Sequence, residues 1–502
     1  MQNLLTAEQT RAADAYTIKH QPISSIDLME KAAMAFVKVF TALYADRNKS
    51  IAILCGQGNN GGDGLAIARL LSEEKYNNIS IYLVKFSSKE SDDYKENLMR
   101  LSKLTVPIYE ITEPVQLTTL KTDFIIDAIL GSGLNKPLAN KYADLAALIN
   151  NLNIEIIAVD MPTGFKTEGA LDENYSCIKA NLVITFQLPK INFFFPESIQ
   201  ALESFKVVKI GLDKDFMQKQ PSIWKLTTEN GIKKILKPRK NFTHKGTYGH
   251  ALLVAGNTTT MGAALLAASS CLHSGAGLTT VCLPQSGLIA LNTILPEVMA
   301  LPRTEYLAIE AFEKFKVIAI GPGLGLEEET EVLFKKLINL QKPLVIDADG
   351  LTILSRNIDL LSKLPANTIL TPHIKEFDRL FGEHKNWWQR VETARKKSKE
   401  LNIIIVLKNQ YTFICAPKGD VFINQTGNPA MASGGMGDVL TGIITSLLAQ
   451  GYTEEQAAIL GVYLHGKSGD DIAKKSFVVT ASQVALQIPK TMKYLLTTDK
   501  KD

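Results

Sequence analysis

Two glycine-rich segments of this chain each carry one aspartate, and these residues are the ones most suited to chemistry. Residues 56–64 read Gly-Gln-Gly-Asn-Asn-Gly-Gly-Asp-Gly, and residues 433–442 read Ser-Gly-Gly-Met-Gly-Asp-Val-Leu-Thr-Gly. Each segment leads into an apolar pattern that predicts a helix. A helix start preceded by glycines presents unpaired backbone N–H groups and a positive dipole end, which favour a phosphate. We therefore expect two pockets for phosphate-bearing ligands, with chemistry in at least one.

The second segment favours phosphoryl transfer. A phosphoryl donor at its glycine amides would have its negative charge stabilised by the helix start. The carboxylate of Asp438 could then take the proton from an attacking hydroxyl. This is kinase chemistry without a Walker loop, because no Gly-x-x-x-x-Gly-Lys-Ser/Thr motif occurs. The alternative is that Asp438 only caps the helix, but that interpretation leaves the density of glycines unexplained.

The first segment resembles a dinucleotide-binding turn only in part. Gly56, Gly58 and Gly61 fit the G-x-G-x-x-G pattern after a predicted strand, yet the next strand ends at Val84 without the acidic residue that holds a ribose. The segment also contains two asparagines and an aspartate, which such a turn does not need. Amide oxygens and carboxylates can hold a hydroxylated ligand or a hard cation.

Two more aspartates stand at the ends of predicted strands in the first half. Asp127 ends one strand and precedes a Gly-Ser-Gly-Leu run, and Asp160 ends the next and precedes Met-Pro-Thr-Gly. Ligands of an open parallel sheet bind beyond the carboxyl ends of its strands. A lone aspartate there could simply cap a turn. Three polar clusters at three strand ends favour a common binding site.

Short apolar strands alternate with helical patterns in both halves, which predicts an α/β protein with parallel sheets covered on both faces. We expect a three-layer α/β/α domain over residues 1–215, a linker over 216–225 and a second α/β domain over 226–502. Helices are expected at residues 262–273, 439–449 and 454–473. The predicted strands are residues 51–55, 79–84, 124–127, 154–160, 182–186 and 205–210 in the first half, and 251–254, 279–282, 317–320, 344–347, 368–370 and 403–407 in the second.

Length and composition exclude several classes of protein. With 502 residues the chain exceeds one ordinary core, and its 55 basic and 51 acidic residues give a net charge of +4, too small to indicate a nucleic-acid partner. The five cysteines form no Cys-x-x-Cys pair, which predicts reduced thiols. No signal pattern begins the chain, and its apolar runs are too short for a membrane span. We expect a cytoplasmic protein without a membrane partner.

The first half resembles the NAD(P)H-hydrate epimerase domains. The resemblance rests on residues 56–64 together with Val-Asp-Met-Pro-Thr-Gly at 159–164, where Met161 and Thr163 depart mildly from the usual Asp-Ile-Pro-Ser-Gly. It implies a Rossmann-like fold, with Asp160 as the catalytic acid/base and a potassium ion held by Asn60, Asp127 and Thr163. The substrate-binding residues that it implies are Asn59, Asn60, Gly61, Gly62, Asp63, Gly131, Ser132, Gly133, Leu134, Asn135, Lys136, Pro137 and Asp160.

The second half resembles the ribokinase-like NAD(P)H-hydrate dehydratases. The ordered motifs that carry the resemblance begin at His244, Gly262, Ser274, Gly321, Asp347, Thr371, Gly427 and Gly434. The resemblance implies that Ala263, Gly325, His373 and Asp438 contact the hydrated substrate, with Asp438 as the catalytic base. It implies that Lys408, Asn409, Gln410, Tyr411, Thr412, Gly434, Gly435, Met436 and Gly437 hold ADP or ATP, with Mg²⁺. Considered alone, His373 could instead be a core histidine.

Together these resemblances imply a bifunctional repair enzyme that is a homo-oligomer. Its first domain would interconvert the R and S epimers of hydrated NADH and NADPH, and its second would dehydrate the S epimer with consumption of a nucleotide. The alternative is a ribokinase-like vitamin or sugar kinase with an N-terminal ligand-sensing domain. A stable phosphorylated product would support that alternative, whereas regained dihydronicotinamide absorbance would oppose it.

Overall fold

The computed structural model describes residues 1–133, 136–172, 175–303 and 308–497, and the chain divides into two compact units. The N-terminal unit comprises Asn3–Ser222 and Asn386–Trp388, and the C-terminal unit comprises Met1–Gln2 and the other described residues after Ser222. The segment 216–225, expected as a linker, holds the end of helix α6 (Lys214–Lys219) and the start of strand β9 (Trp224–Leu226). Within the described residues, no helix has both the length and the apolar character needed to cross a bilayer.

The N-terminal unit is built on a seven-stranded parallel sheet with the order β4-β3-β2-β5-β6-β7-β8. The order reverses at β2, which pairs with β3 on one side and β5 on the other. The loops that follow β2 and β5 therefore diverge and leave a crevice at the carboxyl edge. The strands are β2 (Ile51–Cys55), β3 (Ile79–Val84), β4 (Ile108–Ile111), β5 (Phe124–Ala128), β6 (Glu155–Val159), β7 (Ala180–Phe186) and β8 (Leu202–Val208).

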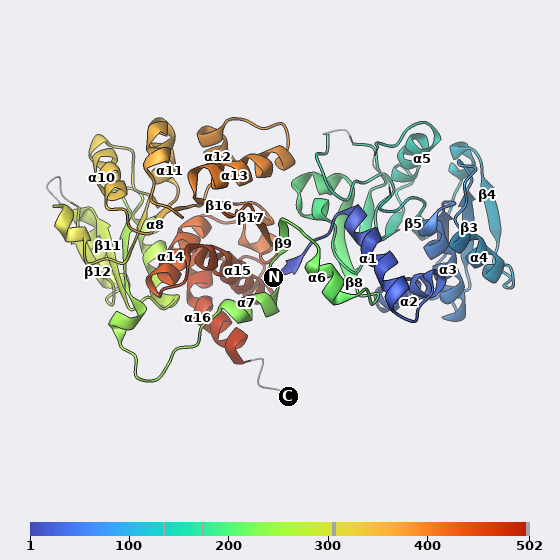
Figure 1. The fold of residues 1–502 in the computed structure, drawn as a ribbon, viewed down its shortest axis with the longest axis horizontal. Helices are drawn as coiled ribbons and strands as arrows, with labels where there is room; N and C mark the ends of the chain where they lie inside the picture. The colour runs from blue at the N-terminus through green and yellow to red at the C-terminus, as the bar shows by residue number, and fades with distance from the viewer. Residues whose placement is uncertain (134–135, 173–174, 304–307, 498–502) are drawn as a thin grey trace. The chain divides into compact units, whose positions relative to one another are not determined.

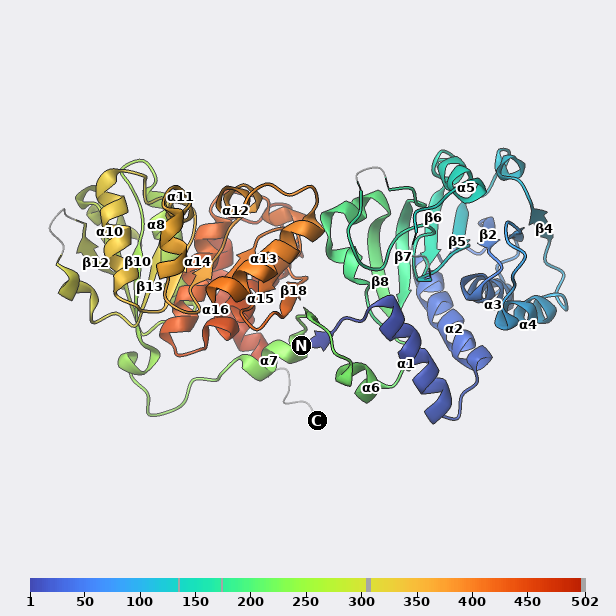
Figure 2. The same cartoon turned by 45° about the horizontal axis from the view of Figure 1, so that its top comes forward.

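Helices cover both faces of this sheet, as the alternation of elements predicts (Figures 1 and 2). In β2 the side chains of Ile51, Ile53 and Cys55 join the core beneath α2 and α3, while Ala52 and Leu54 join the core on the α5 side. This period of two is that of a strand buried on both faces. The helices are α1 (Ala7–His20), α2 (Ser25–Leu43), α3 (Asn59–Glu73), α4 (Asp92–Leu101) and α5 (Lys141–Asn150).

The C-terminal unit contains an eleven-stranded sheet whose order is β1-β9-β18-β17-β16-β15-β14-β13-β10-β11-β12. Strands β10 to β16 run parallel, and β17 and β18 form an antiparallel extension. In this sheet the order of the strands reverses between β10 and β13, which are neighbours in the sheet although they are not consecutive in the chain. The strands are β1 (Gln2–Asn3), β10 (His250–Val254), β11 (Leu278–Leu283), β12 (Met299–Pro302), β13 (Val317–Ile320), β14 (Leu344–Ile346), β15 (Ile369–Leu370), β16 (Ile404–Leu407), β17 (Thr412–Cys415) and β18 (Val421–Asn424).

Helices α8, α14, α15 and α16 pack on one face of this sheet in a shared apolar core. Helices α10 to α13 lie on the opposite side (Figure 1). Every residue of α14 from Val439 to Ala449 is buried, so its start is held firmly at the sheet edge. The helices are α7 (Glu229–Ile235), α8 (Met261–His273), α9 (Leu288–Ile294), α10 (Glu328–Asn339), α11 (Asp349–Arg356), α12 (Ile374–Phe381), α13 (Trp387–Leu401), α14 (Met436–Ala449), α15 (Glu454–Ala473) and α16 (Ala481–Thr497).

Close packing of α14 on α8 gives a first prediction. A Cβ added at Gly442 would lie 2.0 Å from the Ser270 Oγ and 2.1 Å from the Ala267 carbonyl oxygen. We expect Gly442→Ala to lower the free energy of unfolding of the C-terminal unit by about 1–3 kcal/mol or more, because the two helices must separate. Urea unfolding measures this. Gly262→Ala on α8 is the matched control, since its added Cβ meets nothing within 4 Å; equal midpoints for the two variants would contradict the packing argument.

Candidate functional sites

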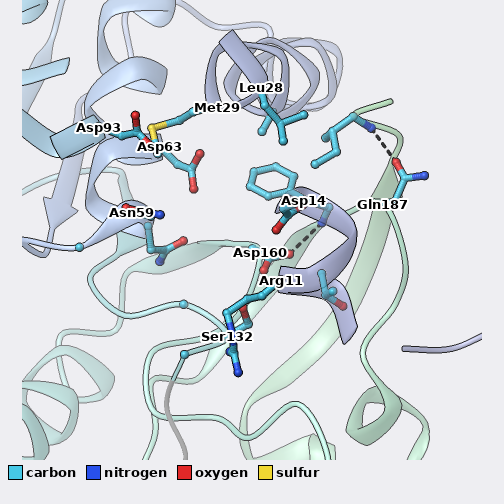
Figure 3. Close-up of a pocket in the computed structure, with 18 of the residues that line it drawn as sticks. Arg11, Asp14, Leu28, Met29, Asn59, Asp63, Asp93, Ser132, Asp160 and Gln187 are labelled. Carbon is cyan, nitrogen blue, oxygen red and sulfur yellow. Dashed lines mark hydrogen bonds between the residues drawn. The ribbon is translucent and has the colours of Figure 1, made fainter. Parts of the chain in front are cut away.

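A cavity of about 660 Å³ lies at the crevice of the N-terminal unit (Figure 3). The segments after β2, β5, β6 and β7 line it, and α1 and α2 close its other side. The crevice is the place where ligands bind to open parallel sheets. The sequence-predicted residues that line the cavity are Asn59, Asn60, Asp63, Gly131, Ser132, Gly133 and Asp160.

The other predicted epimerase residues that the structure describes do not line the cavity. Gly61 and Gly62 are buried in the first turn of α3, where they allow close approach of the backbone: a Cβ at Gly61 would lie 1.7 Å from the Gly56 carbonyl oxygen. Lys136 and Pro137 are exposed and do not line the cavity. Leu134 and Asn135 lie outside the described residues.

The first glycine-rich segment becomes helical earlier than its glycines suggest. Gly58 is the N-cap of α3, and the helix begins at Asn59. Asn59 and Asn60 therefore belong to the first helical turn, beside the positive end of the helix dipole, and Asp63 follows in the next turn. This end of α3 opens on the cavity, so the segment can bind an anionic or polar group.

Asp160 follows β6 with a positive φ of 63°, a conformation that non-glycine residues rarely adopt. Its Oδ1 accepts hydrogen bonds from Lys190 Nζ (2.7 Å), the Phe186 N–H (2.9 Å) and the Thr185 hydroxyl (3.1 Å). In the part of the chain that the structure describes, no group donates to its Oδ2. One carboxylate oxygen is thus fixed by protein, and the other is left for a ligand.

Sequence reasoning missed four charged residues of this cavity, Arg11, Asp14, Asp93 and Lys190, of which Asp14 and Lys190 interact with the charge of Asp160. Lys190 is buried beside Asp160 and follows the end of β7, so the argument from strand ends could have identified it. Asp14 lies on α1, and no motif marks it. Its place in the cavity comes from the packing of α1 alone.

The carboxyl groups of the cavity differ in their environments. Burial, followed by the charge of Asp160, raises the pKa of Asp14 to about 6, against the opposing effect of Lys190. Burial and then the charges of Asp160, Asp14 and Asp93 raise the pKa of Asp63 well above its usual value. The same cavity can therefore hold an ionised carboxylate and a protonated carboxylic acid, the combination that acid–base catalysis requires.

The residues implied for potassium cluster at the loop after β5. Asp127 is fully buried, with its Oδ1 accepting the Thr163 hydroxyl and its Oδ2 accepting the Thr163 N–H, each at 2.7 Å. Burial raises the pKa of Asp127 to about 6, although these hydrogen bonds oppose the shift. The Asn60 side chain lies beside Gly131, whose added Cβ would be 3.2 Å from the Asn60 Cγ. Its Nδ2 has no partner among the described residues.

This cluster fits a monovalent cation. It combines a buried carboxylate, a hydroxyl and an amide, all of which supply the oxygen ligands that hard cations prefer. No lysine or arginine of the described chain pairs with Asp127. Since an uncompensated buried charge is costly, a bound cation would supply the missing positive charge.

The second site lies at the carboxyl edge of the other sheet. The segments after β13, β14, β15 and β16 meet there with the start of α14. Gly325 donates its N–H to the Asp349 Oδ2 (2.9 Å), which joins the segments after β13 and β14. A Cβ at Gly323 would lie 2.9 Å from the Ala263 Cβ, so Ala263 contacts the same loop. Ala263 and Gly325, which the sequence predicts to contact the substrate, are thus brought together.

Asp438 is not a helix cap. Gly435 is the N-cap of α14 in a left-handed conformation (φ 87°), and the cap has no side-chain hydrogen bond. Within the described residues, no donor reaches the Asp438 carboxylate, which lies in the first helical turn. Burial raises the pKa of Asp438 to about 6; the charge of Asp347 adds to the shift and Lys408 opposes it. The capping alternative is therefore wrong, and the carboxylate is available as a base.

An ion pair lies beside Asp438. Lys408 Nζ is 2.8 Å from the Asp347 Oδ1, and the Thr441 hydroxyl donates to the Asp347 Oδ2 at 2.8 Å. Burial disfavours both charges, but each partner stabilises the other, lowering the pKa of Asp347 and raising that of Lys408. A Cβ at Gly437 would be 3.4 Å from Lys408 Nζ. The ammonium group and the α14 amides together suit a phosphate.

His373 is exposed rather than a core residue, with 49% of its side chain accessible. Its Nδ1 accepts the N–H groups of Lys375 (3.1 Å) and Glu376 (3.3 Å), so it caps α12 at the end of β15. The core-histidine alternative is wrong. The other nucleotide residues named from the sequence, Asn409, Gln410, Tyr411 and Thr412, lie between β16 and the start of β17.

A further residue steadies the segment before α14. Asp470 of α15 accepts the Gly427 N–H (3.1 Å to Oδ2) and the Asn428 Nδ2 (2.9 Å to Oδ1). A Cβ at Gly466 would lie 2.4 Å from the Thr426 Oγ1. Sequence reasoning missed Asp470 because only tertiary packing brings α15 against this loop.

These folds and sites define the chain as a two-domain α/β enzyme with a ribokinase-like C-terminal unit. The solved structure of a ribokinase-like superfamily protein from Enterococcus faecalis V583 is 32% identical, with a TM-score of 0.52, and the match covers 55% of this chain and 98% of that one. A family model described as NAD(P)H-hydrate dehydratase matches residues 251–490, and one described as YjeF-related protein N-terminus matches residues 25–192.

Curated relatives match nearly the whole chain. The bifunctional NAD(P)H-hydrate repair enzyme Nnr of Moorella thermoacetica is 34% identical over 493 residues, covering 94% of this chain and 93% of that protein. The Escherichia coli K12 protein of the same name is 32% identical over 453 residues, covering 89% and 85%. The chain belongs to the family of bifunctional NAD(P)H-hydrate repair enzymes.

Proposed function

We propose that the two units carry two successive steps in the repair of hydrated NADH and NADPH. The N-terminal unit interconverts the R and S epimers at C6, and the C-terminal unit dehydrates the S epimer with ADP or ATP. The observation that carries the proposal is the presence of two separate sites with different chemistry: an acid–base cavity in one unit, and Asp438 beside a lysine at a helix start in the other. Family membership supports the same assignment.

In the dehydratase site, Asp438 takes the proton of the C6 hydroxyl as that oxygen attacks the terminal phosphate of the nucleotide. The amides of Gly434, Gly435, Met436 and Gly437, together with Lys408, stabilise the negative charge of the transferring group. Phosphate is a better leaving group than hydroxide. It leaves C6 with the C–O bonding pair, and loss of a proton from C5 forms the C5=C6 double bond of the dihydronicotinamide. Ala263, Gly325 and His373 would contact the hydrated substrate, and residues 408–412 would hold the nucleotide.

Mg²⁺ would enter this site on the phosphates of the nucleotide, where it neutralises charge. The described residues contain no group of three histidine, cysteine or acidic side chains that could hold a metal by themselves.

In the epimerase site, Asp160 would act through its Oδ2 as the acid/base at C6. Asn59 and Asp63 from α3, with Gly131 and Ser132 from the neighbouring segment after β5, would hold the hydrated nucleotide. Potassium would be held by Asn60, Asp127 and Thr163. When bound, it supplies the positive charge that keeps Asp127 ionised and fixes the loop after β5.

The potassium site gives a second prediction. Replacing K⁺ with Li⁺ should slow epimerisation about tenfold, which corresponds to a rise of about 1.4 kcal/mol in the activation free energy, because ligands placed for a large ion fit a small one poorly. Dehydration of pure S epimer, measured in the same buffers, is the control for general salt effects. Equal epimerisation rates in the two salts would contradict the site.

The proposed function is tested with a racemic hydrate, a nucleotide and the full chain, followed by ultraviolet absorbance. We expect complete recovery of dihydronicotinamide absorbance from both epimers. A stable phosphorylated product would instead indicate the vitamin or sugar kinase with an N-terminal sensing domain, which family membership does not favour. Consumption of one epimer alone beyond the spontaneous rate would show that the N-terminal unit is not an epimerase.

A cytoplasmic location and a homo-oligomeric state are part of the same proposal. All five cysteines are free and buried, which suits a reducing compartment. Size-exclusion chromatography with light scattering would test the oligomeric state.

A further inference from the structure

The N-terminal cavity contains an acid whose chemistry the proposed function does not yet use. Asp14 projects from α1 into the space that Asp160 faces from the sheet, and Asp63 lies across from both (Figure 3). In the part of the chain that the structure describes, the Asp14 carboxyl has no hydrogen-bond partner. Asp14 is nevertheless partly buried, so its carboxyl group is free to form hydrogen bonds with a ligand in the cavity.

The carboxyl groups of Asp14 and Asp160 have different surroundings. Three donors, one of them the Lys190 ammonium, converge on the Asp160 Oδ1 and stabilise its carboxylate. Asp14 lacks such donors, and the negative charge of Asp160 opposes its ionisation. Two acids whose surroundings separate their protonation states can serve as base and acid in one reaction. The charged groups that face Asp14 in the cavity are Asp160, Lys190, Asp63 and Asp93 from other elements and Arg11 from its own helix.

Inversion at C6 needs two such groups. An acid donates a proton to the C6 hydroxyl, the C6–O bond breaks, and water leaves with the bonding electron pair. The lone pair of the ring nitrogen forms a C=N bond to C6. A base then removes a proton from a second water on the other face, whose oxygen forms the new C6–O bond as the C=N pair returns to nitrogen. One water leaves and one enters, and no oxidant or reductant is required.

We propose that Asp14 is a second catalytic residue of epimerisation and exchanges protons with the substrate oxygen on the face opposite Asp160. This inference rests on the proposed epimerase function of the N-terminal unit. In one direction Asp14 is the acid and Asp160 the base, and in the reverse direction the roles exchange.

The test measures epimerisation by the full chain, with R hydrate as substrate and chromatographic separation of the epimers. Asp14→Asn should lower kcat by about 10²–10⁴-fold and change KM less than about threefold. For the wild type, kcat/KM should fall as the pH rises through about 6, where Asp14 loses its proton. Asp14→Glu keeps a carboxyl and should keep that falling limb, whereas Asp14→Asn should lack it.

Glu8→Gln removes a carboxylate from the exposed side of the same helix and is the matched control, with wild-type rates expected. The dehydration rate and the thermal midpoint of each variant show whether it is folded. A kcat for Asp14→Asn close to the wild-type value would overturn the inference, and so would a slower variant that keeps the falling limb, because that is the behaviour of a structural residue. If the wild type itself does not epimerise, the proposed function fails instead, and the two failures are distinguishable.

Discussion

Asp438→Asn should lower the rate of dehydration by about 10²–10⁴-fold and leave epimerisation at the wild-type rate. The asparagine keeps the shape of the side chain but cannot accept the proton of the substrate hydroxyl. Single-turnover phosphorylation of the S epimer measures the chemical step, and nucleotide binding by calorimetry measures the ground state. Glu454→Gln, in the first turn of α15, is a control that removes a carboxylate from another helix start in the same unit. Equal losses of both activities would contradict the division of roles.

The raised pKa of Asp438 adds a pH dependence with a defined sign. A base must be ionised, so the wild-type dehydration rate should rise with pH through about 6, and the variant should lack that limb.

The contribution of Asp438 to the free energy of unfolding should change with pH in the opposite direction. Because the pKa of Asp438 is higher in the folded than in the unfolded state, its contribution is most favourable at low pH and is lost as the pH rises through about 6. Asp438→Asn should therefore be more stable than the wild type at pH 7, and this gain should vanish towards pH 4.

Asp160→Asn should slow epimerisation by about 10²–10⁴-fold while dehydration of pure S epimer continues. The asparagine can still accept the Phe186 N–H, so the strand end is kept, but the group that exchanges a proton at C6 is gone. R hydrate as the sole substrate, with separation of the epimers over time, measures the effect. An unchanged epimerisation rate would remove Asp160 as the acid/base.

This variant also leaves Lys190 buried without its carboxylate, and breaking a buried ion pair costs roughly 3–5 kcal/mol. The double variant Asp160→Asn/Lys190→Met removes both charges and should recover much of that stability. If epimerisation stays lost in the stable double variant, the loss is chemical. If it returns, Asp160 acts only through the fold.

The sequence predicted the central elements of both sheets well because they are buried apolar runs between polar turns. The limits of β2, β3 and β13 match those expected, and so do those of α15. Strand β4 was missed because it is an edge strand, with only Ile111 buried, and an exposed strand carries no continuous apolar signal. Strands β17 and β18 were also missed, although the Pro-Lys-Gly-Asp turn between them is a hairpin signal.

The sequence by itself determined the fold class, the glycine-bounded helix starts and the polar side chains that follow the strands, because these depend on spacing over a few residues. Only the tertiary structure decided which of those side chains meet. Lys190 reaches Asp160 across 30 residues, and Lys408 reaches Asp347 across 61. Such pairs depend on which strands are neighbours in the sheet, and Asp14 enters the cavity only because α1 packs over it. Local periodicity does not predict the order of the strands or the packing of the helices. The charged groups that shift the pKa values in each site are therefore identified only from the folded structure.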